Sequence, residues 1–214
     1  NGRYYMELAD LTERGRKTLE LALSSILLGT GIGLFVSFAR ISKSKVFNIP
    51  ASVYITIIRG TPILLQLFII YYGITSLLLI NPFPAAVIAF GVHNGAYIAE
   101  IFRGAIQSID KGQMEAARSL GMTYPKAMRR IILPQAIKRA LPALGNQFII
   151  TIKDTSLASA ITIRELLLKS QQLGSSNFRF MEYFIIAGIY YLTFTATFSY
   201  LVHKVESYLA VSDH

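Results

Sequence analysis

The side chains best suited to binding chemistry in this sequence are polar or charged groups that interrupt long apolar stretches. At membrane depth each charge costs roughly 2.5–3.5 kcal/mol, so such groups must face protein or a wet cavity. The candidates are Arg59, Thr61, Gln66, Asn94, Tyr97, Glu100, Asp154, Thr155 and Ser156. A guanidinium can clamp a carboxylate, and carboxylates and hydroxyls accept hydrogen bonds from an ammonium. The set is therefore suited to binding a small molecule that carries charged or hydrogen-bonding groups.

The first candidate cluster lies where Arg59-Gly60-Thr61-Pro62 interrupts an apolar run, with Gln66 following. Proline frees backbone groups and glycine lets the chain open, which favours a discontinuous helix that can bind a small ion. Arg59 could clamp a substrate carboxylate. Equally, Arg59 could only neutralise a neighbouring acid near the cytoplasmic side.

The second cluster shares one helical face, because His93, Tyr97 and Glu100 lie at positions i, i+4 and i+7. Glu100 could pair with a substrate ammonium. The favoured alternative is an i, i+3 ion pair with Arg103. We expect His93 to be a packed core residue, which leaves Asn94 and Tyr97 as the better substrate contacts.

The third cluster, Lys153-Asp154-Thr155-Ser156, ends an apolar run. It is suited to an amino-acid headgroup, and it is equally compatible with a helix-ending turn. In that turn Asp154 or Ser156 would cap a helix that begins near Thr162 or earlier. Asp154 and Glu100 together favour a cationic amino acid, although glutamine is also compatible.

The composition argues against other kinds of chemistry. The chain has 214 residues, of which 53% are hydrophobic and 15% charged, and it has no cysteine. Its three histidines are scattered, so we expect no metal site and no disulfide. No Walker A pattern occurs, so any ATP must be bound by another chain. The formal charge of +9 resides mainly between apolar spans, which is typical of cytoplasmic loops rather than nucleic-acid binding.

Apolar spans are the elements that must position these residues, and we expect a single all-α integral membrane domain over 1–214. Crossing a bilayer takes about 20 apolar residues. Five predicted transmembrane helices cover approximately 18–39, 51–79, 84–104, 139–155 and 182–204. The first is interpreted as a retained span rather than a signal peptide. Before it, the spacing of Tyr4, Leu8 and Leu11 predicts a short interfacial helix, and a frayed terminus is an equal alternative.

The direction of the spans follows from the basic residues of the loop that covers approximately 105–138. This loop and its flanks carry eight bases against two acids, Asp110 and Glu115. The bases are Arg103, Lys111, Arg118, Lys126, Arg129, Arg130, Lys138 and Arg139. Such an excess predicts a cytoplasmic loop, an outside N-terminus and a cytoplasmic C-terminus. Bases before the first span and within 160–181 weaken this prediction without reversing it.

The apolar spacing and the turn residues of the same loop indicate an element that docks on a protein partner. Met114, Ala117, Leu120 and Gly121 fall at helical spacing and form an apolar stripe. We expect Gly121 to end or bend the first helix, Tyr124-Pro125 to begin the next, and Pro134 to kink or end that one. The product is a short helix that could fill a groove on a partner. The alternative is an amphipathic cover without a partner.

The spacing within this loop is specific. Glu115-Ala116-Ala117 is followed by three residues and Gly121, then by nine residues, Ile131, one residue and Leu133-Pro134. This pattern resembles the EAA loop of bacterial ABC importer permeases. The stretches 59–62, 94–100, 103–106 and 153–157 extend the resemblance to the permease subunits of type I ABC importers, in the polar amino-acid uptake family (histidine/arginine/glutamine-type permeases).

The resemblance implies a five-span permease fold with a cytoplasmic coupling helix, in the cytoplasmic membrane of a bacterium. It also implies a second permease subunit, as a homo- or heterodimer, an extracytoplasmic amino-acid-binding protein, and ABC ATPase subunits. Those ATPase subunits would bind ATP and Mg, and this chain would hold no cofactor. The residues that would contact the ATPase are Glu115, Ala116, Ala117, Leu120, Gly121, Tyr124 and Pro125.

The leading hypothesis is therefore a transport subunit, not an enzyme, for polar and preferably basic amino acids. It would form a pathway by alternating access, driven by a separate ATPase through the EAA loop. The alternative is a secondary transporter or channel powered by an ion gradient. That alternative predicts inverted repeats, and the two halves of the sequence share neither motif nor hydropathy pattern. A membrane-embedded enzyme would need a nucleophile–base or metal set that the spans lack.

Overall fold

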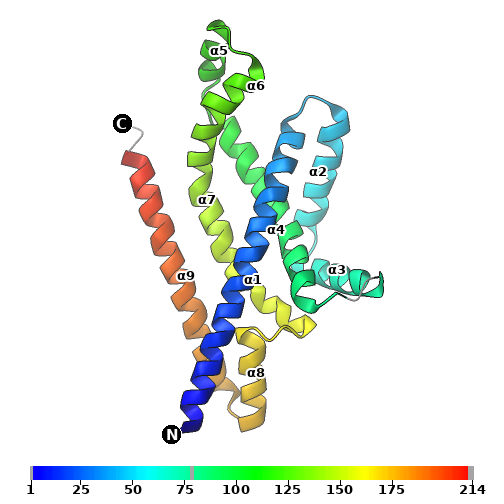
Figure 1. The fold of residues 1–214 in the computed structure, drawn as a ribbon, viewed down its shortest axis with the longest axis vertical. Helices are drawn as coiled ribbons and strands as arrows, with labels where there is room; N and C mark the ends of the chain where they lie inside the picture. Colours follow the sequence, from blue (N-terminus) through cyan, green and yellow to red (C-terminus); the bar gives the residue numbers. More distant parts are fainter. Residues whose placement is uncertain (1, 78–79, 212–214) are drawn as a thin grey trace.

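The computed structural model describes residues 2–77 and 80–211, and this part of the chain is helical with no strand. In chain order the elements are α1 (Gly2–Ile41), α2 (Lys45–Gly60), α3 (Ile63–Leu77), α4 (Pro82–Gln107), α5 (Lys111–Ser119), α6 (Tyr124–Ala127), the π-helical η1 (Met128–Ile132), α7 (Leu133–Asp154), the 3-10 helix η2 (Thr155–Ile161), α8 (Leu166–Asn177) and α9 (Phe180–Val211). The predicted all-α class is confirmed. The short helices α5 and α6 lie at the end of the molecule opposite the N-terminus (Figure 1).

The pairing of α1 with α4 forms the centre of the fold, and glycines on both helices let the backbones approach. A Cβ added at Gly33 would lie 2.6 Å from Cγ2 of Ile98. Conversely, a Cβ added at Gly95 would lie 2.6 Å from Cγ2 of Ile32. Ile98 of α4 therefore packs against Gly33 of α1, and Ile32 of α1 packs against Gly95 of α4. Small residues are the usual means of close helix packing in membranes.

The N-terminal residues do not form a separate interfacial helix, so that prediction is wrong. α1 continues without a break from Gly2 to Ile41, which at about 1.5 Å per residue gives roughly 60 Å. The hydrocarbon core of a bilayer is about 30 Å thick, so α1 must extend beyond it. Its first turns pack on other helices, because Leu11 is fully buried in a cluster with Leu166, Tyr183 and Ala187.

The second predicted span is broken where the sequence analysis favoured a discontinuous helix, so the expected interruption at 59–62 is confirmed. Residues 45–60 and 63–77 form α2 and α3, which are bent by 110° at their junction, and positions 78–79 lie outside the described residues. Thr61 is extended, with φ −121° and ψ 149°. Pro62 explains this, because proline disfavours helical geometry at the residue before it and supplies no N–H.

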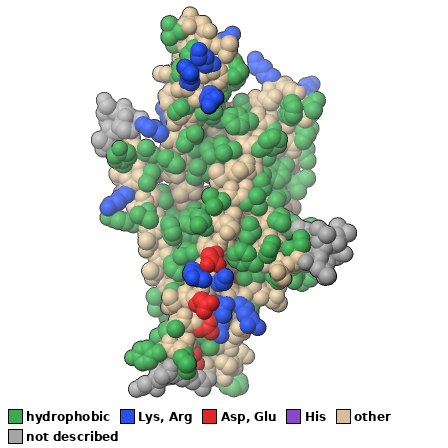
Figure 2. All heavy atoms as spheres, in the orientation of Figure 1, with side chains coloured by type: hydrophobic (Ala, Val, Ile, Leu, Met, Phe, Trp, Pro, Cys, Tyr) green, Lys and Arg blue, Asp and Glu red, His purple; other side chains and the backbone are tan. Residues whose placement is uncertain are grey.

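Three described helices are long and apolar enough to cross a membrane, namely α1, α4 and α9, and the bent pair α2–α3 would make a fourth. The helix α7 is not among them, because it carries charged and amide side chains along its length. The expectation of five spans therefore stays a prediction. Figure 2 shows hydrophobic side chains over much of the face, Lys and Arg at the end that bears α5 and α6, and a second group of Lys and Arg beside Asp and Glu toward the opposite end.

The helix expected to begin near Thr162 or earlier begins at Leu166 instead. Thr162 has a left-handed backbone, with φ 66°, and ends η2 rather than starting a helix. Asp154 stands at the N-cap position of η2 without a side-chain cap hydrogen bond. The Ser156 hydroxyl donates back to the carbonyl of Lys153 at 2.7 Å. Neither residue caps α8, so the capping interpretation is wrong.

Candidate functional site

The bend between α2 and α3 is held by Gln66, which is 6% exposed. Its Nε2 donates to the carbonyl oxygens of Ile58 at 2.8 Å and Thr61 at 3.0 Å, and it lies 2.8 Å from the Thr61 hydroxyl. Its Oε1 lies 2.9 Å from Nδ1 of His93 on α4. These bonds replace helical ones that Pro62 cannot make. Thr61 and Gln66, both predicted substrate contacts, thus shape the backbone at this point.

A charged cluster lies one turn before the bend and involves Arg59, Tyr97, Glu100 and Arg103. Arg103 donates to Glu100 from Nε at 2.9 Å and from Nη2 at 2.7 Å, which confirms the predicted i, i+3 pair. Arg59 Nη1 is 4.0 Å from the same carboxylate, and its guanidinium lies 5.3 Å from the centre of the Tyr97 ring. Two guanidinium groups therefore share one carboxylate, and the excess positive charge is suited to an anionic group of a ligand.

Asn94 belongs to α4, is 1% exposed and is bonded to residues of α7. Its Oδ1 accepts a hydrogen bond from Nε2 of Gln147 at 2.8 Å and lies 2.9 Å from the hydroxyl of Thr151. Our sequence analysis did not single out Gln147 or Thr151. Their i, i+4 spacing was the available signal, since it places both on one face of a helix. In this arrangement the Asn94 side chain joins two helices.

The third candidate cluster lies where α7 passes into η2. Thr155 is buried, and its hydroxyl donates to the carbonyl of Ile152 at 2.7 Å. Asp154 is half-buried, and within the described part of the chain its carboxylate accepts no hydrogen bond. Among the described residues, no hydrogen bond or ion pair links this cluster to Arg59 or Gln66. Asp154 is thus the candidate carboxylate whose hydrogen-bonding capacity is open to a ligand.

The EAA segment folds as predicted around Gly121. Asp110 caps α5 by accepting a hydrogen bond from the Gly112 N–H at 2.7 Å. At the other end, Met122 N–H donates to the Ala117 carbonyl at 3.1 Å and Gly121 N–H to Arg118 at 3.0 Å, which is a complete Schellman motif. Gly121 has φ +80°, a conformation that glycine adopts without steric cost.

The surface of this segment differs from the predicted apolar stripe. Ala117 is 2% exposed and Met114 packs against the core, whereas Leu120 is 84% exposed. The difference arises because Leu120 lies just beyond the last residue of α5, where the chain turns. Tyr124 is 50% exposed, and it begins α6 with Pro125, as predicted. The described EAA segment therefore presents apolar side chains outward.

The connection from α6 into α7 passes through a π-helical turn at Met128–Ile132. The helix does not end at Pro134, as one form of the prediction had it, but continues after this widened turn. Proline has no N–H, and its ring clashes with the carbonyl four residues earlier. A π turn relieves that clash, and such turns are frequently found at functional sites.

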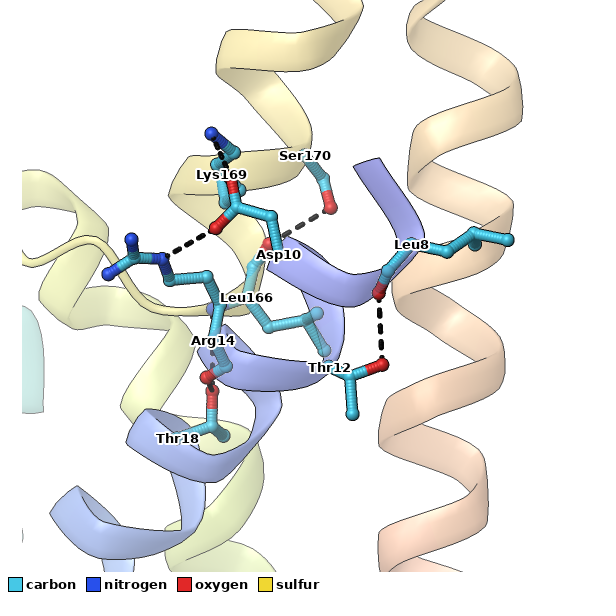
Figure 3. Close-up of polar contacts among 8 residues, drawn as sticks. All are labelled: Leu8, Asp10, Thr12, Arg14, Thr18, Leu166, Lys169 and Ser170. Carbon is cyan, nitrogen blue, oxygen red and sulfur yellow. Dashed lines mark hydrogen bonds and ion pairs between the residues drawn. The ribbon is translucent and has the colours of Figure 1, made fainter. Parts of the chain in front are cut away.

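At the opposite end, polar contacts join α1 to α8 (Figure 3). Asp10 pairs with Lys169 of α8 and also accepts from Nε of Arg14 at 3.1 Å. The Thr18 hydroxyl donates to the Arg14 carbonyl at 3.2 Å and accepts from the Leu166 N–H at 3.4 Å. These contacts hold the extended first turns of α1 against the start of α8.

Glu165 is a fully buried acid at this end that the sequence analysis missed. It caps α8 by accepting from the N–H groups of Leu167 and Leu168, each at 2.8 Å, and it accepts from the Tyr191 hydroxyl at 2.7 Å. Burial raises the pKa of the Glu165 carboxyl above its ordinary value, and these hydrogen bonds oppose that shift. The available signal was an acid directly before the apolar run 166–168, because acidic side chains are favoured at the N-terminus of a helix.

Comparison with known proteins assigns the class. A model of the family described as binding-protein-dependent transport system inner membrane component matches residues 29–209, so the chain belongs to that family. The chain is 41% identical over 199 residues to the glutamine transport system permease protein GlnP of Escherichia coli (strain K12), covering 92% of this chain and 91% of that protein. It is 42% identical over 191 residues to the L-cystine transport system permease protein TcyB of Bacillus subtilis (strain 168), covering 88% and 82%.

A solved structure of an amino acid ABC transporter with histidines has the same fold, with a TM-score of 0.90, 40% identity and 96% of each chain covered. These findings confirm the resemblance drawn from the EAA spacing. The chain is an inner membrane permease subunit of the amino-acid ABC importers, of the type I fold. The ion-gradient alternative is not favoured by this membership.

Proposed function

We propose that this permease forms an alternating-access pathway for polar amino acids and that the EAA segment couples it to a separate ATPase. The coupling proposal rests on the apolar side chains that the segment α5–α6 exposes. Leu120 and Tyr124 are exposed around a turn that Gly121 holds rigidly. An apolar projection fixed in this way is suited to a groove on a protein partner. ATP and Mg would be bound by that partner.

For the substrate we propose a polar amino acid, with a preference for basic ones. Asp154 supports this preference, because its carboxylate has no hydrogen-bonded partner in the described part of the chain. Glu100 adds little, since Arg103 already holds it with two hydrogen bonds. Arg59 and Tyr97 are the proposed contacts for the substrate carboxylate, because Arg59 stays 47% exposed beside a ring that orients it.

The family membership also supports three further proposals. A second permease subunit would complete the pathway, an extracytoplasmic binding protein would deliver the substrate, and the N-terminus would lie outside. The opposite placement of the N-terminus and the basic EAA segment is consistent with this orientation (Figure 1).

The coupling proposal is tested by crosslinking in the intact transporter. The chain has no cysteine, so Leu120→Cys provides a single reactive site in it. We expect Leu120→Cys to crosslink to the ATPase subunit, and Leu192→Cys, exposed on α9, to give no such product. A transporter in which Leu120→Cys is modified freely by a soluble maleimide and never reaches the ATPase would contradict the proposal.

A further inference from the structure

An open groove of about 720 Å³ lies between the end of α1 and the EAA segment. Its lining residues are Phe38, Ile41, Ser42, Lys43, Ile106, Met114, Arg118, Tyr124 and Met128. Most of these side chains are apolar, and they come from α1 and its following turn, α4, α5, α6 and η1. A volume of this size is within the usual range for a small-molecule site.

The groove also carries two cations without acidic partners. The side chains of Lys43 and Arg118 make no ion pair or hydrogen bond with any residue that the structure describes. Ser42 adds a hydroxyl beside Lys43. An apolar trough with two unneutralised cations and one hydroxyl matches a ligand that has a hydrocarbon chain and an anionic headgroup.

The position of the groove indicates where such a ligand comes from. α1 ends at Ile41 and α4 at Gln107, and the basic EAA segment follows directly. The groove therefore lies at the boundary between apolar helices and a basic, polar segment. In a membrane-embedded chain that boundary is the level of the phosphate headgroups.

We propose that this groove binds one anionic glycerophospholipid. The phosphate lies between Lys43 and Arg118, and an acyl chain lies along Phe38, Ile106 and Met114. The site is distinct from the edge proposed to meet the ATPase, since Glu115, Ala116 and Leu120 do not line it. Only Tyr124 belongs to both surfaces. The bound lipid joins the end of α1 to the EAA segment.

The test uses the absence of tryptophan from this chain. Phe38→Trp places a reporter in the groove, and Leu192→Trp places one on exposed α9. Each permease–ATPase complex is reconstituted in nanodiscs of phosphatidylcholine and phosphatidylglycerol, with brominated acyl chains on one lipid at a time. The fluorescence of the unsubstituted complex is subtracted. Met114→Trp, on the opposite wall, replaces Phe38→Trp if that variant does not fold.

We expect brominated phosphatidylglycerol to be enriched at the groove reporter relative to the α9 reporter. A basic side chain near an anionic surface contributes about fivefold in binding, so the pair gives an enrichment of about 25-fold. Lys43→Gln with Arg118→Gln should remove the enrichment. Lys126→Gln with Arg129→Gln, which removes two charges of the same segment outside the groove, should leave it unchanged.

Three outcomes would overturn the proposal. One is equal enrichment at both reporters, and another is enrichment that survives removal of Lys43 and Arg118. The third is an absence of quenching of the groove reporter in the complex by either brominated lipid while the α9 reporter is quenched, because a protein partner would then occupy the groove. Retention of phosphatidylglycerol by the purified complex, measured by mass spectrometry, provides a readout independent of transport and of fluorescence.

Discussion

Gln66 of α3 donates a hydrogen bond to the carbonyl oxygen of Ile58 of α2 at 2.8 Å, across a bend of 110°. The two residues lie on different helices, and the side-chain amide provides the donor that Pro62 lacks. The amide oxygen of Gln66, Oε1, lies 2.9 Å from Nδ1 of His93. One side chain thus joins both halves of a broken helix to α4, and it bonds the residue directly before Arg59.

Replacing Gln66 should therefore destabilise the permease. Gln66→Leu preserves volume but leaves partly buried carbonyl groups without donors, which costs about 1–3 kcal/mol. For a chain of this size that corresponds to a loss of very roughly 2–12 °C in Tm. Thermal unfolding of the purified complex measures it. The matched control is Gln172→Leu on exposed α8, and an equal Tm loss in both variants would argue against the bend as the cause.

Close packing of α1 on α4 predicts a strong position effect for glycine substitutions. Gly95→Ala puts a Cβ 2.6 Å from Ile32 and 2.8 Å from the Tyr54 hydroxyl, so we expect a loss of about 1–3 kcal/mol from overpacking. Gly31→Ala has nothing within 4 Å and should be neutral or slightly stabilising. Comparison of the two unfolding curves checks this, and a stable Gly95→Ala variant would contradict the packing account.

Gly121 should be essential for coupling rather than for membrane insertion. Gly121→Asp places a side chain at φ +80°, which costs about 1–2 kcal/mol locally and disturbs the Schellman turn. Glu115→Lys reverses a charge on the exposed face of α5. In both variants we expect normal amounts in the membrane, with substrate-stimulated ATP hydrolysis uncoupled from transport.

The control for these coupling variants is Gly104→Ala, on α4 close to the same segment, where a Cβ meets nothing within 4 Å. It should transport normally. Normal substrate-stimulated hydrolysis and normal uptake in Gly121→Asp and Glu115→Lys would remove the basis for the coupling role.

Asp154 should discriminate between cationic and neutral substrates. Asp154→Asn keeps the shape and removes the charge, so uptake of arginine or lysine should fall about tenfold relative to glutamine, equivalent to about 1.4 kcal/mol. Competition assays in proteoliposomes measure the ratio. Ser156→Ala is the neighbouring control, because the Ser156 hydroxyl is already used by the Lys153 carbonyl. An unchanged ratio would refute the preference for basic amino acids.

The buried carboxyl of Glu165 should make the stability of the folded permease depend on pH. Burial raises the pKa of its carboxyl in the folded state, so the folded state binds the proton more tightly than the unfolded state does. Its contribution to stability is therefore fully present below the ordinary glutamate pKa and is lost as the pH rises through the raised value. Glu165→Gln should flatten this part of the Tm–pH profile. Glu165→Ala should also lose the cap, at about 0.5–2 kcal/mol.

Local chemistry predicted much of the EAA segment. Gly121 and Pro125 act through their own backbone preferences, so the end of α5 and the start of α6 could be placed from the sequence. The Glu100–Arg103 pair was likewise predictable, because both residues lie on one helix at i, i+3 spacing. Features that depend on a few neighbouring residues are visible in sequence patterns.

The errors share a different cause, which is dependence on distant partners. Leu11 suggested an interfacial helix, but its contacts come from α8 and α9, far along the chain. The 110° bend needs Gln66 to satisfy the opened backbone, and Pro62 alone signalled only an interruption. Glu165 caps α8 and is bonded by Tyr191 on another helix, so the sequence analysis assigned the cap to Asp154 or Ser156 instead. No local rule contains these pairings.

The π-helical turn at Met128–Ile132 lies directly before α7, so a change in its hydrogen bonding would change the orientation of α7. A turn bonded to the fifth preceding residue can tighten to the fourth, and this rotates the rest of the helix without uncoiling it. A push received at α5 and α6 would thus arrive at Gln147, Thr151 and Asp154 as a twist about the axis of α7. Under the proposed coupling, Pro134 would therefore not break the connection but keep a turn beside it that allows α7 to rotate.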